Sequence, residues 1–191
     1  MELNRNRSGL VTWQTVIAYW LIPSEPAHSC FQQTINDLAR RYDAPVFEPH
    51  VTVHVGADHA DRVNEAIADA ARECTPIRLT PAGINESEEF IKTLFVEFEL
   101  AAELQRINEV IRNAAHDSSQ YQLKPHLSLL YKTMEAATRQ DLVASVRVPL
   151  SEITFGAIKA VRCSSPAKSR ADVEAWRVFA AALLFQRKSD L

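Results

Sequence analysis

The stretch Pro49-His50-Val51-Thr52-Val53-His54-Val55-Gly56 places polar side chains at every second position of a run rich in β-branched residues. This alternation predicts a β-strand, in which side chains at i and i+2 point to the same face of the sheet. We therefore expect the imidazole of His50 and the hydroxyl of Thr52 to project side by side. The same order of proline, histidine, apolar residue and hydroxyl recurs at Pro125-His126-Leu127-Ser128. Two copies of one arrangement in a single chain indicate an internal repeat that carries function.

If both strands face one cleft, two imidazoles and two hydroxyls converge on one small volume. Histidine titrates near neutral pH, so one ring can act as a base while the other acts as an acid. The hydroxyls of Thr52 and Ser128 can donate to the non-bridging oxygens of a phosphoryl group, where negative charge grows in the transition state. These groups suit the hydrolysis of a phosphodiester without a metal ion, and a strained 2′,3′-cyclic phosphate is a suitable substrate. The sequence leaves open whether His50 or His126 is the base.

Composition narrows the class of protein. The 191 residues include 47% apolar residues, as in ordinary soluble globular proteins. The net charge of −3 argues against nonspecific binding of long nucleic acid, which requires a basic excess. Four glycines are too few for a glycine-rich phosphate loop.

The same sequence predicts a cytoplasmic protein. No apolar run approaches the ~20 residues that span a bilayer, and no apolar signal-peptide core follows the N-terminal arginines. We expect residues 1–10 to be a disordered tail. The three scattered cysteines, Cys30, Cys74 and Cys163, fit thiols in a reducing compartment, although a pair among them remains open.

Hydrophobic spacing predicts strands and helices in alternation. Besides the two motif strands, we expect strands at residues 15–22, 77–79, 93–100, 152–163 and 176–185. We expect helices at 26–42, from 58 or 61 to 74, at 101–115 and at 135–146, with a solvated acidic turn at 85–89 and a polar loop at 164–172. Both halves follow the order strand, helix, motif strand, helix, and no linker separates them. We therefore predict one α+β domain, 1–191, with two lobes whose motif strands face each other across a cleft.

Four stretches of the chain carry a resemblance to a known family. They are Tyr19-Trp20-Leu21-Ile22-Pro23, Phe47-Glu48-Pro49-His50-Val51-Thr52-Val53, Lys124-Pro125-His126-Leu127-Ser128-Leu129-Leu130-Tyr131, and Lys159-Ala160-Val161-Arg162-Cys163 with Trp176 beyond it. The two His-x-Thr/Ser-x motifs resemble those of the 2H phosphoesterase superfamily, which includes 2′,5′ RNA ligase-like proteins and cyclic nucleotide phosphodiesterases. The similarity is greatest to the cyclic phosphodiesterase branch that opens ADP-ribose 1″,2″-cyclic phosphate.

The resemblance implies a bilobal fold of two antiparallel β-sheets, related by a pseudo-twofold axis around a central cleft and flanked by helices. It also implies metal-independent hydrolysis of cyclic phosphates, with no cofactor. The expected products are ADP-ribose 1″-phosphate, or 2′-phosphates from nucleoside 2′,3′-cyclic phosphates.

The resemblance also assigns roles to individual residues. His50 and His126 take the acid–base roles. Thr52, Ser128 and Tyr131 take phosphate-binding roles. Trp20 and Phe90 fall where aromatic side chains can stack on a nucleotide. The alternative for Trp20 and Tyr131 is a packed aromatic side chain of the core.

Other polar residues have a structural and a functional interpretation. His54 shares the parity of His50 and Thr52, which invites a metal site with His59. Residues four apart on an extended strand are about 13 Å apart, so they cannot share one ion, and we expect His54 at the cleft edge or on the surface. Lys124, Lys132 and Arg162 are either surface cations or contacts to a diphosphate.

Three functions remain open at this point. The first is a monomeric enzyme that hydrolyses a small cyclic-phosphate nucleotide. The second is a related enzyme that joins or trims RNA ends, which would need a basic groove. The third is a binding module that keeps the phosphate pocket without turnover.

Overall fold

The computed structural model describes residues 14–119, 121–147 and 151–185. Within these residues the chain forms strands β1 (Gln14–Pro23), β2 (Val51–Ala57), β3 (Ile77–Leu79), β4 (Pro81–Glu86), β5 (Leu94–Phe98), β6 (His126–Leu130), β7 (Ile153–Ser165) and β8 (Arg177–Leu183). The helices are α1 (Ala27–Tyr42), α2 (Ala60–Glu73), α3 (Ala102–Ala114), α4 (Ala136–Ser145) and α5 (Arg170–Glu174), with a 3₁₀ turn η1 (Phe90–Lys92). The α+β class is confirmed. The predicted tail at residues 1–10 lies outside the described residues.

The two motif strands are neighbours at the centre of the sheet. The strand order is β3-β7-β1-β2-β6-β5-β4, with β8 also paired to β7, and all pairings between the described strands are antiparallel. Strands β2 and β6 are joined through one register pair, Val51 with Leu127. Instead of two separate sheets, the described strands therefore form one sheet whose halves meet at a single point. Pro49 and Pro125, which precede the motif histidines, have no N–H to extend this pairing.

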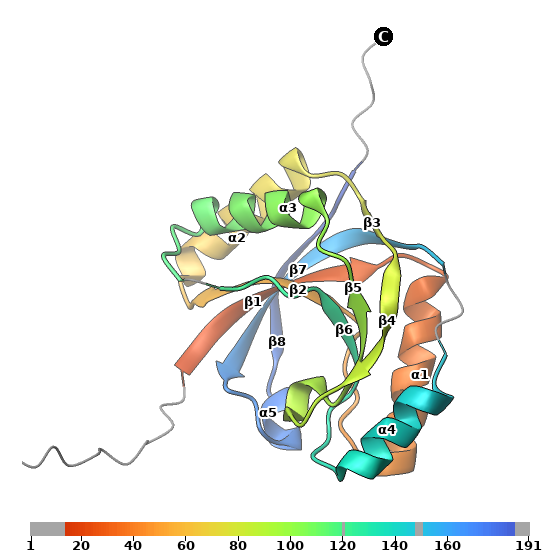
Figure 1. Cartoon of the computed structure of the whole chain (residues 1–191). Coiled ribbons are helices and arrows are strands. Elements are labelled where there is room, and N and C mark those ends of the chain that lie inside the picture. Colours follow the sequence, from red (N-terminus) through yellow and green to blue (C-terminus); the bar gives the residue numbers. More distant parts are fainter. Residues whose placement is uncertain (1–13, 120, 148–150, 186–191) are drawn as a thin grey trace, which may run out of the picture.

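The helices cover the sheet in a crossed arrangement. Helix α1 lies against β6 in the other half of the sheet, and α3 lies against β2. Figure 1 shows α2 and α3 together at one end of the molecule and α1 and α4 at the other. The buried faces follow the predicted helical spacing, for example Leu104, Ile107 and Ile111 on α3. Among the described helices, none is both long and apolar enough to cross a membrane.

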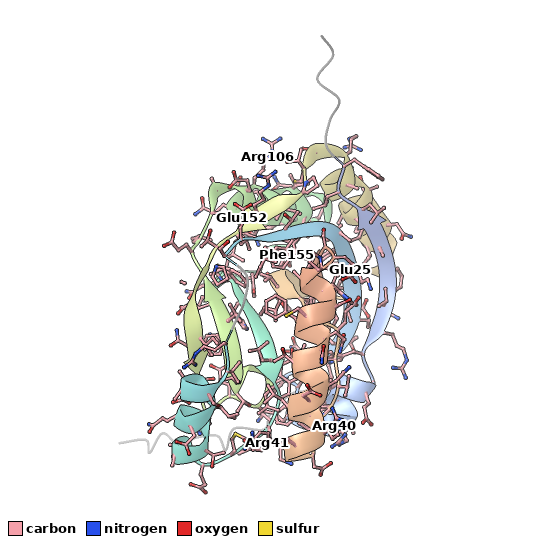
Figure 2. All side chains as sticks on the ribbon, turned by 90° about the vertical axis from the view of Figure 1, so that its right-hand side faces the viewer. Glu25, Arg40, Arg41, Arg106, Glu152 and Phe155 are labelled. Carbon is pink, nitrogen blue, oxygen red and sulfur yellow. The ribbon has the colours of Figure 1, made fainter. Side chains whose placement is uncertain are left out.

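One hydrophobic core spans both halves of the sheet. Phe155 of β7 is fully buried within it, and Figure 2 shows this ring inside the molecule while Arg40 and Glu152 lie at its surface. The core joins apolar residues from β1, β2, β5, β6 and β7 to the inner faces of α1, α2 and α3. The motif strands are thus fixed from both lobes.

Two elements differ from the sequence prediction. Strand β4 occupies a segment in which Pro81 and Gly83 predict a break, because pairing with β5 overrides the local signal. Pro81 is tolerated as the first residue of an edge strand, and Gly83 follows the register shift. Helix α5 lies partly within the predicted loop at 164–172, and the Ser169 hydroxyl caps it by accepting from the N–H of Asp172.

Candidate active site

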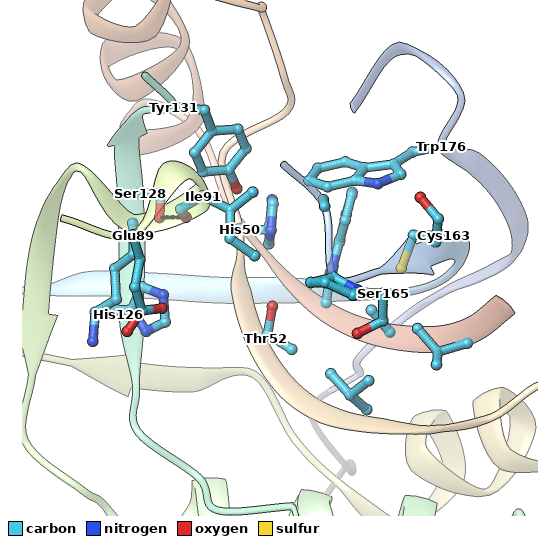
Figure 3. A pocket seen from close by; sticks show the side chains of 18 of the residues that line it. His50, Thr52, Glu89, Ile91, His126, Ser128, Tyr131, Cys163, Ser165 and Trp176 are labelled. Carbon is cyan, nitrogen blue, oxygen red and sulfur yellow. Dashed lines mark hydrogen bonds between the residues drawn. The ribbon is translucent and has the colours of Figure 1, made fainter. Parts of the chain in front are cut away.

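A cavity of about 290 Å³ opens where the two halves of the sheet meet. It brings together six of the seven predicted site residues, which are His50, Thr52, His126, Ser128, Tyr131 and Trp20. Figure 3 shows His126 to the left of His50, with Thr52 below His50 and Trp176 to its upper right. The repeat in the sequence thus corresponds to a convergence of side chains in space.

Both motif histidines are held by the same kind of hydrogen bond. The Nδ1 atom of His50 lies 2.7 Å from the carbonyl oxygen of Glu48, and Nδ1 of His126 lies 2.8 Å from that of Lys124. A carbonyl oxygen only accepts, so each Nδ1 carries the hydrogen and donates it. In the neutral rings Nε2 is therefore the unprotonated nitrogen. The chain places this acceptor two residues before each histidine, just ahead of the proline.

Aromatic rings surround His50. Its imidazole stacks on Trp20 with centroids 3.7 Å apart, and the ring edges of Phe47 and Trp176 lie with centroids at 6.4 Å and 6.5 Å. The His50 side chain is 7% exposed. This burial lowers its pKa to about 3; the nearby His126 acts in the same direction, and the hydrogen bond to Glu48 opposes it. The ring is therefore neutral at physiological pH.

His126 lies in a more charged environment. Burial is the main cause that lowers its pKa, and the positive charge of Lys92 adds to it. The hydrogen bond to the Lys124 carbonyl and the carboxylates of Glu89 and Glu97 oppose this shift. The two histidines therefore share a geometry but differ in what surrounds them.

The hydroxyl groups of the site differ in their hydrogen bonds. The Thr52 hydroxyl makes no hydrogen bond within the described part of the chain, so it is available to a ligand. The Ser128 hydroxyl donates to the carbonyl of Ile91 at 3.0 Å. Tyr131 is 3% exposed and stacks on Phe47 at 3.6 Å, and burial raises the pKa of its phenol, which stays a hydrogen-bond donor.

Two predicted site residues have a different environment from the one expected. Phe90 does not line the cavity; it packs behind Tyr131, with ring centroids 6.4 Å apart. Trp20 does line the cavity, but one face of its indole is covered by His50.

The cations singled out in the sequence do not line the cavity. Lys132 donates to the carbonyl of Asp43, and Arg162 pairs with Asp58. Lys124 is exposed and lies outside the cavity wall.

The cavity wall includes residues that were not identified from the sequence, among them Glu89, Lys92 and Tyr121. Glu89 ends the turn that the sequence predicts as a solvated acidic loop, Lys92 lies in η1 just after it, and the structure places both near His126. Tyr121 also lines the cavity, and its hydroxyl donates to the backbone carbonyl of Thr52 at 3.3 Å. No repeat or motif marks these positions, because they reach the site only through the pairing of β4, β5 and β6.

The expectation that His54 lies at the cleft edge or on the surface is wrong. It is 1% exposed and lies on the opposite side of β2 from the cavity, where its ring faces Tyr19. The register between β1 and β2 skips one residue at Val53, which is a β-bulge. Beyond this bulge the parity is reversed, so Val55 rather than His54 lines the cavity.

The buried His54 is satisfied by a polar network. Its Nε2 lies 2.7 Å from the Asp117 carboxylate, and its Nδ1 lies 3.1 Å from the amide nitrogen of Asn108. The amide donates, so Nδ1 accepts and Nε2–H donates to Asp117. Ser119 also donates to Asp117. The network ties α3 and the segment before Tyr121 to the back of β2.

The sequence analysis predicts that His54 and His59 do not form a metal site. Within the described ranges, no group of three or more histidine, cysteine, aspartate or glutamate side chains has an arrangement that could hold a metal ion. His59 is exposed and takes no part in the His54 network.

Comparisons with known proteins identify the family of this chain. The family model described as cyclic phosphodiesterase-like protein matches residues 15–184. The cyclic phosphodiesterase of Arabidopsis thaliana is 24% identical over 172 residues, covering 86% of this chain and 93% of that protein.

Solved structures share the fold at low identity. E. coli LigT complexed with 3′-AMP superposes with a TM-score of 0.56 and 16% identity, covering 92% of this chain and all of LigT. The protein TT0787 of Thermus thermophilus gives a TM-score of 0.56 and 18% identity, covering 91% of this chain and all of that one. The family match spans nearly the whole described chain, and the protein belongs to the cyclic phosphodiesterase-like family of the 2H phosphoesterase superfamily, whose members act on phosphodiester bonds.

Proposed function

We propose that the protein hydrolyses a cyclic phosphodiester to a phosphomonoester, with His50 and His126 as an acid–base pair. The observation that carries this proposal is the matched fixing of the two rings. Each Nδ1–H is held by the carbonyl two residues earlier, so each Nε2 is left as the reactive atom at one shared cavity. General acid–base catalysis requires such positioning before any adjustment of pKa.

In the proposed reaction one ring is neutral and the other is protonated. The neutral Nε2 takes a proton from water while the water oxygen bonds to phosphorus. The bond from phosphorus to one oxygen of the cyclic ester breaks, and the protonated ring gives its Nε2 proton to that oxygen. The products are a phosphomonoester and a free hydroxyl, and the two rings have exchanged protonation states.

Three hydroxyl groups are proposed to bind the phosphate. Thr52 offers a free hydroxyl, and the phenol of Tyr131 remains protonated. The Ser128 hydroxyl donates to the Ile91 carbonyl, and rotation about its side-chain bond can turn it toward a charged phosphoryl oxygen, which is a stronger acceptor. Donors aimed at the oxygens on which charge develops lower the barrier.

As substrate we propose ADP-ribose 1″,2″-cyclic phosphate or a nucleoside 2′,3′-cyclic phosphate. The name of the Arabidopsis relative supports a cyclic phosphodiester, and LigT has been crystallised with 3′-AMP and with phosphate. The aromatic wall formed by Trp20, Trp176 and Tyr131 supports a nucleotide, since such surfaces stack on bases.

The test is an assay in chelator with both classes of substrate, followed by phosphorus NMR. The proposal predicts turnover without added metal and a single phosphomonoester isomer. His59→Ala is a matched control, because His59 is an exposed histidine outside the cavity. Ligand binding with no product after long incubation would favour a binding module, and tight, salt-dependent binding of RNA oligomers would favour an RNA-end enzyme.

A further inference from the structure

A second groove begins on the far side of His126. It has a volume of about 240 Å³, and it shares two wall residues, Lys92 and His126, with the main cavity. The two hollows therefore lie on either side of the same two side chains, Lys92 and His126. Lys124, Leu123 and Leu100 also line the groove.

The groove carries two positive charges without carboxylate partners. Lys92 is half-buried, with its Nζ 4.4 Å from the centroid of Phe95, and Lys124 is exposed. Neither ammonium group has an ion pair within the described ranges, whereas Lys159 of β7 is paired bidentately with Glu48.

The single carboxylate of the groove is already engaged. Glu97 accepts a hydrogen bond from the side-chain amide of Asn85 at 2.5 Å. The neutral amide leaves this carboxylate charged, but the two lysines outnumber it, so the side chains that line the groove carry a net positive charge. The buried ring of Phe95 lies against the ammonium group of Lys92 and reduces its contact with water, which strengthens the effect of this charge on an anion.

The opposite end of the main cavity differs in chemistry. Its wall contains Val16, Ala18, Val55 and Cys163, and none of the wall residues on that side is charged. A nucleobase fits such a neutral, apolar surface, but an additional phosphate does not. We therefore expect a second negatively charged group of the substrate to bind in the groove on the far side of His126.

We propose that the groove beyond His126 binds a second phosphate of the substrate, linked covalently to the cyclic phosphate in the main cavity. The proposal rests on the proposed function and narrows its substrate class. The second phosphate has two sources. It belongs either to the diphosphate of ADP-ribose 1″,2″-cyclic phosphate or to the internucleotide link of an RNA end that carries a 2′,3′-cyclic phosphate.

The experiment compares kcat/KM for three substrates: adenosine 2′,3′-cyclic phosphate, ApA ending in a 2′,3′-cyclic phosphate, and ADP-ribose 1″,2″-cyclic phosphate. The first has only the cyclic phosphate and is the internal reference. We expect at least one extended substrate to exceed the reference about tenfold at low salt, with the ratio approaching one at high salt as the ammonium charges are screened. The substrate that gains identifies the source of the second phosphate.

A charge swap at Leu100 makes the test specific to the groove. This side chain is 50% exposed, so Leu100→Lys and Leu100→Glu are compatible with the fold. Leu100→Lys is expected to raise the ratio of extended to reference kcat/KM, and Leu100→Glu to lower it several-fold. Circular dichroism and thermal unfolding confirm that both variants are folded.

The outcomes separate the groove from the catalytic site. Equal kcat/KM values for all three substrates, or a ratio that ignores the sign of the charge at residue 100, would overturn the groove assignment and leave the proposed function standing. No turnover of any of the three would contradict the proposed function and the groove assignment with it.

Discussion

Burial of a neutral His50 has a measurable consequence for stability in acid. The pKa of this histidine is about 3 in the folded protein, against an ordinary value near 6.5. Between these values the unfolded chain binds a proton that the folded chain does not, so stability rises with pH. As pH falls through this window the folded state is progressively destabilised.

The magnitude follows from linkage. The free energy of unfolding loses about 2 kcal/mol through His50 alone when the pH falls from about 7 to about 5. At pH 5 the folded-state ring is still unprotonated, so this loss is set almost wholly by the unfolded state. His50→Gln removes the titrating group, and its free energy of unfolding should therefore fall about 2 kcal/mol less over the same interval.

Urea unfolding followed by tryptophan fluorescence at the two pH values measures this difference. Other groups titrate in both proteins and cancel in the comparison. His59→Gln, at an exposed site outside the cavity, is the control for the replacement of a histidine by glutamine. Equal losses in wild type and His50→Gln would refute the reasoning, because they would mean that His50 accepts a proton as readily when folded as when unfolded.

Three further predictions concern the site and its support. The pKa of His126 lies below its ordinary value, so the protonated form that the reaction needs becomes scarce as pH rises. We therefore expect kcat/KM to fall about tenfold per pH unit above about pH 6.5. A profile that stays flat to pH 8 would contradict this. Gly56→Ala would bring a methyl group within 2.5 Å of the Asp117 carboxylate, so chemical denaturation should show a loss of about 1–3 kcal/mol; unchanged stability would contradict the close packing. Thr52→Val keeps the shape and removes the free hydroxyl, so kcat/KM should fall about 10²-fold with little change in the melting temperature, and full activity would exclude a phosphate contact.

The sequence predicts the centre of the site well because its signal is local. A histidine and a hydroxyl residue two positions apart, directly after a proline, define one face of a strand, and two such strands are adjacent in the sheet. The same logic fails at His54, where the alternation continues in the sequence but a bulge reverses the parity in the structure. That bulge arises from pairing with β1, which no local pattern in β2 records.

The remaining differences also come from tertiary pairing. Strand β4 forms against β5 despite Pro81 and Gly83, and this pairing carries the neighbouring segment with Glu89 and Lys92 to the wall of the cavity. Taken locally, three glutamates in a turn predict only a solvated loop. The sequence alone does not predict which charged side chains surround His126 or line the groove beyond it. They follow from the three-dimensional pairing of the strands.

The central claim is that His50 and His126 act as one acid–base unit. The most direct test is a double-mutant cycle on turnover of the best substrate in chelator, with His50→Ala, His126→Ala and the double variant. We predict that each single replacement lowers kcat by about 10²–10⁴-fold and that the double variant is hardly slower than the worse single one, because the pair works only when complete. Losses that multiply in the double variant would show two independent contributions, and a double variant with full activity would contradict the mechanism.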